Sequence, residues 1–424
     1  MATSDVSGLD VEAIREDFPI LDRKIGGDVT VPGPDEGDDK PLYYLDNAAT
    51  SHTPRQVVEA MTEYYYEYNS NVHRGIHSLS QEASVAYEQA HDRVAEFIGA
   101  DGREEIVFTK NTTEAFNLLA YTWGLTELEP GQNVVTTQME HHASLVTWQQ
   151  LCEKQGAEVR YVEIDDDGRL DMDDFRAKVD DDTAMVSAVH VSNTLGTVNP
   201  VTEITEIAHE HGALSFIDGA QAVPTRPVDV AEIDADFYAF SGHKMLGPTG
   251  IGVLYGKRDL LEDLPPFLVG GSMIRRVEFE GATWEDLPWK FEAGTPPIAE
   301  AIGLTAAIDY LEDVGMEAIE RREWELASYA YERLNEFDDI EIYGPETDRG
   351  GLVSFNLEGV HAHDLSSILD DHGVAVRAGD HCTQPLHDVL DVPASTRASF
   401  YLYNTTDEID ELIEAVDTAR QLFA

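Results

Sequence analysis

Short apolar runs alternate with helical patterns through half of the chain, and this order constrains the fold more than any other feature. Across residues 42–256, runs rich in β-branched side chains are separated by stretches with helical periodicity. Strands that alternate with helices form a parallel sheet covered by helices. Ligands of such sheets bind beyond the carboxyl ends of the strands. The runs that we interpret as strands are 105–109, 133–137, 184–191, 214–218, 237–241 and 251–255.

The pattern becomes mainly helical beyond residue 294. Leu304, Ile308 and Leu311 share one helical face. A second stripe, short apolar runs and a last helix follow, at 326–337, 352–357, 375–377 and 407–423. We therefore predict a smaller α+β domain in this part of the chain. The predicted organisation is an N-terminal segment with an acidic Gly/Pro-rich loop (1–40, the loop at 26–40), a large domain (41–300) and a small C-terminal domain (301–424).

The charge of the chain is strongly negative. It carries 82 acidic against 28 basic residues, a formal net charge of −54. Such a charge repels phosphate backbones, so we expect no nucleic-acid partner. The acidic residues are spread along the chain and lysine is scarcer than arginine, which we interpret as adaptation to a salt-rich, halophilic environment.

The sequence favours a cytoplasmic protein without a membrane span. Its longest stretch without charge, residues 183–202, is rich in Ser, Thr, Asn and Gly. The acidic N-terminus lacks the basic and apolar regions of a signal peptide. The two cysteines, Cys152 and Cys382, lie far apart and suggest neither a disulfide framework nor a metal site.

A lysine and an aspartate follow two of the predicted strands. Lys244 ends the motif Ser241-Gly242-His243-Lys244, and a buried lysine there can form a Schiff base with a carbonyl cofactor. Asp218 ends the run 214–218, where a carboxylate can pair with the protonated ring nitrogen of pyridoxal phosphate. Taken alone, each residue also fits an ordinary turn or a helix cap.

Two further strand ends carry polar groups. Thr112 and Thr113 precede a helical run, and a helix start of this kind is a phosphate site, although a simple cap explains them equally well. His141 follows the run 133–137 at the same edge of the predicted sheet. Its position becomes informative only through the neighbouring groups.

Ordered motifs between Leu45 and Ser399 together resemble one family. They are residues 45–49, 71–77, 140–142, 192–196, 218–221, 241–244, 291–296, 377–382 and 397–399. The chain is similar to the pyridoxal-phosphate-dependent cysteine desulfurases of the class V aminotransferase group, and within them to the SufS type. The resemblance implies the α/β fold type I of these enzymes. Its large domain has a mainly parallel seven-stranded sheet covered by helices, and its C-terminal domain is smaller and α+β.

The resemblance also implies roles around the cofactor, pyridoxal 5'-phosphate. Lys244 would hold it covalently, Asp218 would pair with its ring nitrogen, Gln221 would contact its ring hydroxyl and His141 would stack on its ring. No metal is implied.

The phosphate of the cofactor has its own implied set of residues. Thr113, Ser241 and His243 would bind it, and Thr112 joins the cofactor-binding residues. Thr295 would be supplied by the other subunit of a homodimer.

The implied substrate is L-cysteine and the implied products are L-alanine and enzyme-bound sulfur. Asn193 and Arg397 would hold the substrate carboxylate, and Arg377 would border the same pocket. The Cys382 thiolate would attack the substrate sulfur and become a persulfide. Only a thiolate is nucleophilic, so His381 or a nearby cation is expected to assist its deprotonation.

The segment 377–382 is short, which resembles the family branch that passes its persulfide to a dedicated acceptor of the SufE or SufU type or to an iron–sulfur scaffold. Asp380 departs from the pattern, because many relatives carry a second histidine there. Cys152, inside a helical run, is expected to be a small core residue.

Three alternatives stay open. Selenocysteine lyase and other class V pyridoxal-phosphate enzymes share the cofactor site, and a non-catalytic sulfur-assembly scaffold would share the fold. Cys382 argues against an aminotransferase, which needs no thiol, and the presence of both Lys244 and Cys382 argues against a scaffold. The choice between sulfur and selenium is undecided by the sequence.

The acidic composition yields a first prediction. Molar salt screens charges beyond about 3 Å, so the self-repulsion of this chain should weaken and the fold should be stable there. We expect the thermal melting midpoint, followed by circular dichroism, to rise from dilute buffer to molar KCl, with loss of structure in dilute buffer. A midpoint that does not change with salt would contradict the halophilic interpretation.

Overall fold

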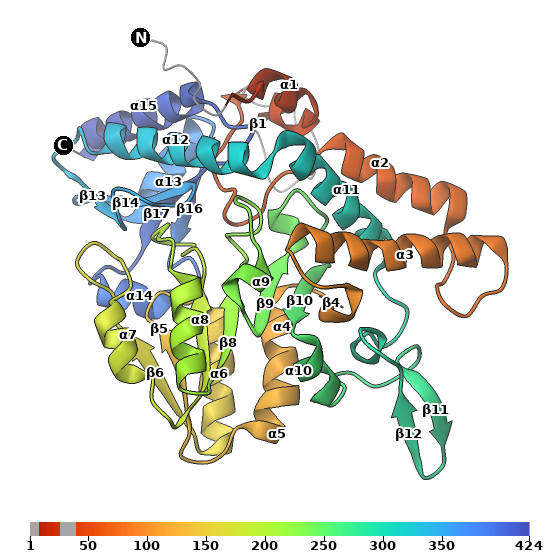
Figure 1. The fold of residues 1–424 in the computed structure, drawn as a ribbon. Coiled ribbons are helices and arrows are strands. Elements are labelled where there is room, and N and C mark those ends of the chain that lie inside the picture. The colour runs from red at the N-terminus through yellow and green to blue at the C-terminus, as the bar shows by residue number, and fades with distance from the viewer. Residues whose placement is uncertain (1–7, 26–39, 424) are drawn as a thin grey trace.

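The computed structural model describes residues 8–25 and 40–423, so the predicted loop at 26–40 lies outside the described residues except for Lys40. Two main sheets, one large and one small, are covered by helices (Figure 1). The helices are α1 (Val11–Glu16), α2 (Arg55–Glu63), α3 (Ser78–Phe97), α4 (Thr112–Leu119), α5 (Leu125–Glu127), α6 (His142–Gln155), α7 (Met172–Lys178), α8 (Val201–Glu210), α9 (Val230–Ile233), α10 (Arg258–Asp263), α11 (Ile298–Val314), α12 (Met316–Leu334), α13 (Ala362–Asp371), α14 (Gln384–Val389) and α15 (Thr406–Phe423). Turns of 3₁₀ helix occupy Pro19–Asp22, Arg103–Glu105, Gly242–Lys244 and Trp289–Phe291, and π-helical turns occupy Tyr64–Tyr68 and Ala120–Gly124.

The large sheet has seven strands in the order β4-β10-β9-β8-β7-β5-β6. Its strands are β4 (Ile106–Thr109), β5 (Asn133–Thr137), β6 (Glu158–Val162), β7 (Thr183–Val189), β8 (Leu214–Asp218), β9 (Phe237–Ser241) and β10 (Gly252–Gly256). Only β10 runs antiparallel to its neighbours, β4 and β9, and the other pairs are parallel. The predicted α/β fold with a mainly parallel seven-stranded sheet is confirmed.

The sequence located six of these seven strands. The bounds of β5, β8 and β9 agree with the prediction, and those of β4, β7 and β10 differ by one or two residues. The prediction missed β6, which reads Glu-Val-Arg-Tyr-Val and lies at the edge of the sheet. An edge strand is partly solvated, so β6 carries charged residues where the search looked for apolar runs.

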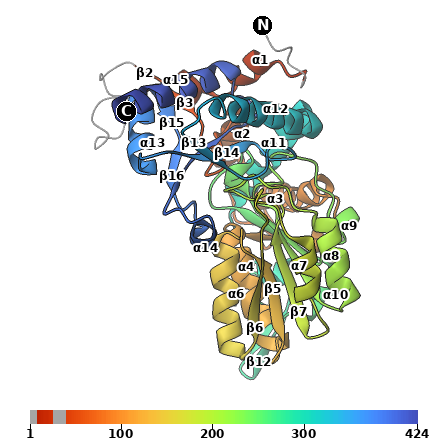
Figure 2. The same ribbon diagram turned by 90° about the vertical axis from the view of Figure 1, so that its left-hand side faces the viewer.

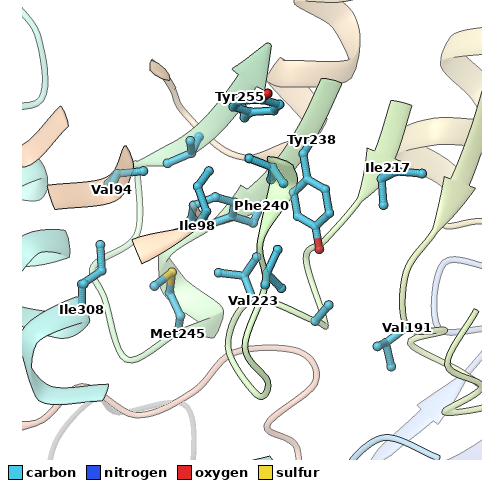
Figure 3. Packing of buried hydrophobic residues seen from close by; sticks show 14 of the residues in the cluster. Val94, Ile98, Val191, Ile217, Val223, Tyr238, Phe240, Met245, Tyr255 and Ile308 are labelled. Carbon is cyan, nitrogen blue, oxygen red and sulfur yellow. The ribbon is translucent and has the colours of Figure 1, made fainter. Parts of the chain in front are cut away.

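Both faces of the large sheet are buried. Along β9, Phe237 and Ala239 belong to the core that α4 and α6 cover, while Tyr238 and Phe240 point into the opposite core. That opposite core includes Val94 and Ile308 from other helices, as Figure 3 shows. Figure 2 shows α4 and α6 on one side of the sheet and α7 and α8 on the other. Burial on both faces explains why the strands read as continuous apolar runs.

The smaller sheet is antiparallel, in the order β13-β14-β17-β16. Its strands are β13 (Ile340–Tyr343), β14 (Leu352–Leu357), β16 (Arg377–Gly379) and β17 (Ser395–Ser399). A separate core lies between this sheet and helices α12, α13 and α15. The proposed boundary at residue 300 falls within α11, so the division into domains stays a prediction.

The predicted run 375–377 is divided between two strands. One is β15 (Val374–Ala375), which pairs in parallel with β3 (Tyr43–Tyr44), and the other is β16. The segment at Tyr43–Tyr44 therefore packs on the C-terminal part of the chain. The remaining strands are β1 (Lys24–Ile25), which pairs with β2 (Lys40–Pro41), and the exposed hairpin of β11 (Ile274–Glu278) and β12 (Gly281–Trp284), which projects from the body in Figure 1.

Cys152 lies in α6 and is 2% exposed, so its interpretation as a core residue is confirmed. Burial raises the pKa of this thiol to about 12, which makes it a poor nucleophile. Among residues 8–25 and 40–423, no helix has the length and apolar character that crossing a membrane requires.

Candidate active site

A cavity of about 280 Å³ lies at the carboxyl ends of the large sheet, where that sheet meets the smaller one. Strand ends, the first residues of α4 and α6 and the strands β16 and β17 all contribute to its walls. All the predicted site residues except Thr295 line it: Thr112, Thr113, His141, Asn193, Asp218, Gln221, Ser241, His243, Lys244, Arg377, Cys382 and Arg397. Thr295 is exposed on the same chain, away from this cavity.

Lys244 follows β9 within a 3₁₀ turn, so its side chain starts at the end of a central strand. Burial lowers the pKa of the amine to about 8, and the charge of Asp218 opposes this shift. Near neutral pH a useful fraction of the amine is therefore uncharged and nucleophilic.

Asp218 is the last residue of β8 and is 3% exposed. Burial raises the pKa of its carboxyl, while the bond that it accepts from the backbone N–H of Ala220, 2.9 Å long, and the nearby Lys244 lower it. The next residue, Gly219, has no room for a side chain, because a Cβ there would lie 1.9 Å from the ring of Tyr238. The chain can therefore turn into the cavity directly after the carboxylate.

The first turn of α4 is joined to the end of β9. The N–H of Thr112 donates to Oγ of Ser241 at 2.9 Å, and the hydroxyls of the two residues lie 2.7 Å apart. Asn111 caps the helix by accepting from the N–H of Glu114. The backbone groups of Thr112 and Thr113 thus lie at a helix start, which favours a bound phosphate.

Two polar side chains close the neighbouring wall. Burial lowers the pKa of His243 to about 4, and its Nδ1 lies 3.2 Å from Oγ1 of Thr50. Gln221 donates from Nε2 to the carbonyl of Ala48 at 2.7 Å. Both side chains are held in place as neutral groups.

His141 caps the N-terminus of α6. Its Nδ1 accepts from the N–H of Ala143 at 3.0 Å, so in the neutral ring Nε2 carries the proton. Burial, with Lys244 as a second cause, lowers the pKa of His141 to about 4. The cavity therefore contains a neutral imidazole whose second nitrogen is free of this capping bond.

Arg397 provides a buried cation on the opposite wall. It is 2% exposed and donates from one terminal nitrogen to the carbonyl of Asn193 at 2.9 Å. Its Nε is buried without a hydrogen-bond partner among the described residues. Asn193 in turn donates to the carbonyl of His381 at 2.8 Å. A substrate carboxylate fits beside such an unpaired donor.

Cys382 lies on an exposed loop with an unusual backbone. His381 and Cys382 have φ values of 50° and 60°, a region that non-glycine residues rarely occupy. The Cys382 N–H donates to Oδ1 of Asp380 at 2.9 Å, and its carbonyl accepts from the N–H of His142 at 2.8 Å. The bond from His142 fixes the loop at the start of α6. Asp380, where the sequence departs from the family pattern, contributes a hydrogen bond within the turn.

His381 is poorly suited to deprotonate Cys382. The His381 side chain is buried, its Nε2 lies 3.0 Å from Oγ of Ser395, and burial and the nearby Arg397 lower its pKa to about 2. Such an imidazole is a weak base. By contrast, Lys244, Arg377 and Arg397 line the same cavity as Cys382.

Three residues near the cavity were given no role from the sequence. His142 also accepts, at Nε2, from the N–H of Gln384, and Asp46 pairs with both arginines of the site. Glu140, the residue before His141, is buried, accepts from Val189 N–H and Thr137 Oγ1, and has a pKa that burial raises to about 8. The only signal in the sequence for these three residues was their position within the family motifs.

Comparison with known proteins agrees with this geometry. Residues 43–412 match the model of the family described as aminotransferase class-V. The chain belongs to this family. It is 70% identical, over 98% of both chains, to a cysteine desulfurase of Haloferax volcanii, and 66% identical, over the full length of both, to a probable cysteine desulfurase of Halobacterium salinarum. The apo structure of a cysteine desulfurase from Thermococcus onnurineus superimposes with a TM-score of 0.89 at 42% identity, over 96% of this chain and 97% of that one.

The residues present fit pyridoxal phosphate, the cofactor of this family. A buried amine with a lowered pKa and a buried carboxylate line the same cavity, and a helix start beside them suits a phosphate. Lys244, Asp218 and the α4 N-terminus are thus suited to the aldehyde, the ring nitrogen and the phosphate of the cofactor.

This geometry predicts the pH dependence of cofactor attachment. Because only the uncharged amine attacks an aldehyde, the rate at which cofactor-free protein captures pyridoxal phosphate should rise with pH and reach half its maximum near pH 8. Borohydride reduction followed by mass spectrometry of the Lys244 peptide measures this rate, with Lys244→Ala as the control. Half-maximal capture near 10.5, the ordinary value for lysine, would contradict the predicted shift.

Proposed function

We propose that this protein is a cysteine desulfurase of the SufS type, which converts L-cysteine to L-alanine and retains the sulfur as a persulfide on Cys382. The observation that carries the proposal is the shared cavity: Cys382 lines the same space as Lys244. A class V enzyme that exchanged only amino groups would need no thiol at this place.

Lys244 and Asp218 perform the chemistry nearest to the cofactor. When bound, pyridoxal phosphate supplies an electron sink that stabilises negative charge on the substrate carbon. Asp218 would pair with the ring nitrogen, and the attraction of its carboxylate would favour the protonated form of that nitrogen. Lys244, with its lowered pKa, takes the proton from the substrate Cα and can return it. His141, a neutral imidazole in the cavity wall, would cover the ring of the cofactor.

Arg397 and Asn193 orient the amino acid. The unpaired Nε of Arg397 donates to the substrate carboxylate, and Asn193 fixes both this arginine and the loop of Cys382 through its carbonyl and its amide. Asn193 therefore holds both Arg397, which anchors the substrate carboxylate, and the loop that carries the nucleophile Cys382. This coupling sets the substrate sulfur facing Cys382.

The sulfur transfer follows from this placement. The Cys382 thiolate attacks the sulfur of the substrate within the cavity that Arg377, Arg397 and Lys244 also line. The new S–S bond forms as the bond between Cβ and sulfur breaks. The electron pair of the broken bond stays with the substrate, and a proton added at Cβ completes alanine. No external oxidant or reductant is required.

We further propose a homodimer in which Thr295 completes the phosphate site of the partner, together with Thr113, Ser241 and His243 of the first subunit. The proposal is supported by the exposure of Thr295, in a segment that Glu292, whose side chain is 5% exposed, ties to α3. The side chain of Glu292 accepts from Tyr87 and contacts His91. A rigid segment can present a threonine to another chain.

We propose that a cytoplasmic acceptor protein of the SufE or SufU type, or an iron–sulfur scaffold, takes the persulfide for iron–sulfur cluster assembly. Exposure of Cys382 on a short, fixed loop supports this arrangement, because the sulfur cannot travel far and a partner must approach it. Selenocysteine lyase stays as the alternative, since selenium and sulfur would enter the same cavity.

Two variants test the assigned chemistry. Lys244→Ala should lose alanine formation and the visible absorbance of the bound cofactor. Cys382→Ala should keep that absorbance and lose persulfide formation, because the cofactor site is intact without the nucleophile. Alanine release from L-cysteine, with and without a thiol reductant, measures turnover, which should be faster with the reductant. Full sulfur transfer by Cys382→Ala would overturn the mechanism, and selenocysteine as the second substrate tests the alternative.

Mixed dimers test the origin of Thr295. We expect Lys244→Ala to be inactive and Thr295→Ala to bind the cofactor more weakly. After the two variants are mixed and allowed to exchange subunits, one site of each mixed dimer regains both native residues. Activity at limiting cofactor should then exceed the sum of the separate variants. No gain after demonstrated exchange would place Thr295 outside the partner's site.

A further inference from the structure

His142 connects the start of α6 with the loop of Cys382. It is the first residue of α6 and directly follows His141, which lines the cavity. Two hydrogen bonds of His142 reach the loop: its backbone N–H donates to the carbonyl of Cys382 at 2.8 Å, and its Nε2 accepts from the N–H of Gln384 at 3.0 Å. One residue therefore contacts the chain both at the nucleophile and two positions after it.

The ring of His142 accepts from a donor that α14 itself leaves open. Gln384 is the first residue of α14, and N–H groups in the first turn of a helix have no partner within that helix. The preceding residue, Thr383, makes no capping bond with its side chain, and Pro385 has no N–H. Because Nε2 of His142 accepts, its neutral ring carries the proton on Nδ1, the opposite arrangement to that of His141.

The backbone of this loop requires support from other elements. His381 and Cys382 are successive residues with φ values of 50° and 60°. Side chains disfavour this left-handed region, and such a conformation persists only where the surrounding structure holds it. Asn193 holds the carbonyl of His381 before the nucleophile, and His142 holds the carbonyl of Cys382 and the N–H of Gln384. Contacts on both sides of the sulfur therefore fix its place.

We propose that His142 is a positioning residue for sulfur transfer, whose ring holds the loop so that the Cys382 thiol meets the substrate sulfur. The proposal rests on the proposed function, in which Cys382 is the nucleophile. Among the described residues, those that line the cavity include His141 and Ala143 but not His142. His142 therefore acts through the loop and not on the reacting atoms. A small displacement of a reacting group is enough to slow a reaction between bound groups.

Amide hydrogen exchange of the cofactor-loaded protein tests the contact itself. Because the N–H of Gln384 donates to the ring of His142, this amide should be protected in wild-type protein and should lose its protection in His142→Leu. Mass spectrometry of peptides that cover residues 383–386 measures the difference. A Gln384 amide that exchanges in wild-type protein as fast as an amide of an unfolded peptide would overturn the proposal, whether or not a variant folds.

Single-turnover kinetics with L-cysteine test the consequence for the reaction. The rate of persulfide formation on Cys382 should fall about tenfold in His142→Leu, because leucine accepts no hydrogen bond. His142→Gln should recover most of this rate, since the side-chain oxygen of glutamine can accept from the same N–H. Exchange of the Cα proton of L-alanine in deuterated water uses Lys244 and the cofactor but not the thiol, so its rate should be the same in all three proteins.

His363 offers a matched control. It is an exposed histidine in the first turn of α13, outside the residues that line the cavity. His363→Leu should therefore change neither persulfide formation nor Cα-proton exchange. A merely structural role of His142 would lower both rates together in His142→Leu, and glutamine would then bring no selective recovery of persulfide formation.

The outcomes separate this inference from the proposed function. Equal rates of persulfide formation in wild-type protein and folded His142→Leu would overturn the role of His142 and leave the proposed function standing. A parallel loss of persulfide formation and Cα-proton exchange would do the same. Failure of wild-type protein to form a persulfide and alanine from L-cysteine would instead overturn the proposed function, and with it the use of this contact in sulfur transfer.

Discussion

The burial of the Lys244 amine in a cavity shared with the Asp218 carboxylate is the interaction on which the site depends. Each group follows a central strand of the large sheet, so the positions of both are set by the backbone pairing of β8 with β9. Burial lowers the pKa of Lys244 and raises that of Asp218, and their mutual attraction opposes both shifts. A cofactor that bonds to the amine and pairs with the carboxylate makes use of two groups that the apolar core has removed from water.

The second half of the site comes from the junction between the two sheets. Arg377 and Arg397 belong to the smaller sheet, while Asn193 follows the large one, and a hydrogen bond between Arg397 and Asn193 connects them. The loop of Cys382 is fixed from the same junction by Asn193 and His142. Carboxylate binding and presentation of the nucleophile are therefore geometrically linked, although they arise from segments nearly 200 positions apart.

Parts of this arrangement were predictable from local sequence. Strands buried on both faces read as apolar runs, which is why β5, β8 and β9 agree with the prediction to the residue. The edge strand β6 was missed because solvent contact permits Glu158 and Arg160 within it. The family motifs identified the residues that line the cavity. His381 shows, however, that a residue next to the nucleophile in the sequence need not assist it. It precedes the nucleophile, yet its ring is buried against Ser395, and three basic residues from other segments line the cavity of Cys382 instead.

The sequence by itself determined the alternation of strands and helices, the strand ends at which Asp218 and Ser241 stand, and the set of residue types that the family's chemistry requires. These features depend on periodicity and on short motifs, which are local. The tertiary structure decided which charges meet. Asp46 is more than 300 positions from Arg377 and Arg397 in the chain, and no local sequence pattern predicts that its carboxylate binds both arginines. Electrostatic interactions act through space and depend on burial, so the charge balance of this pocket exists only in the folded chain.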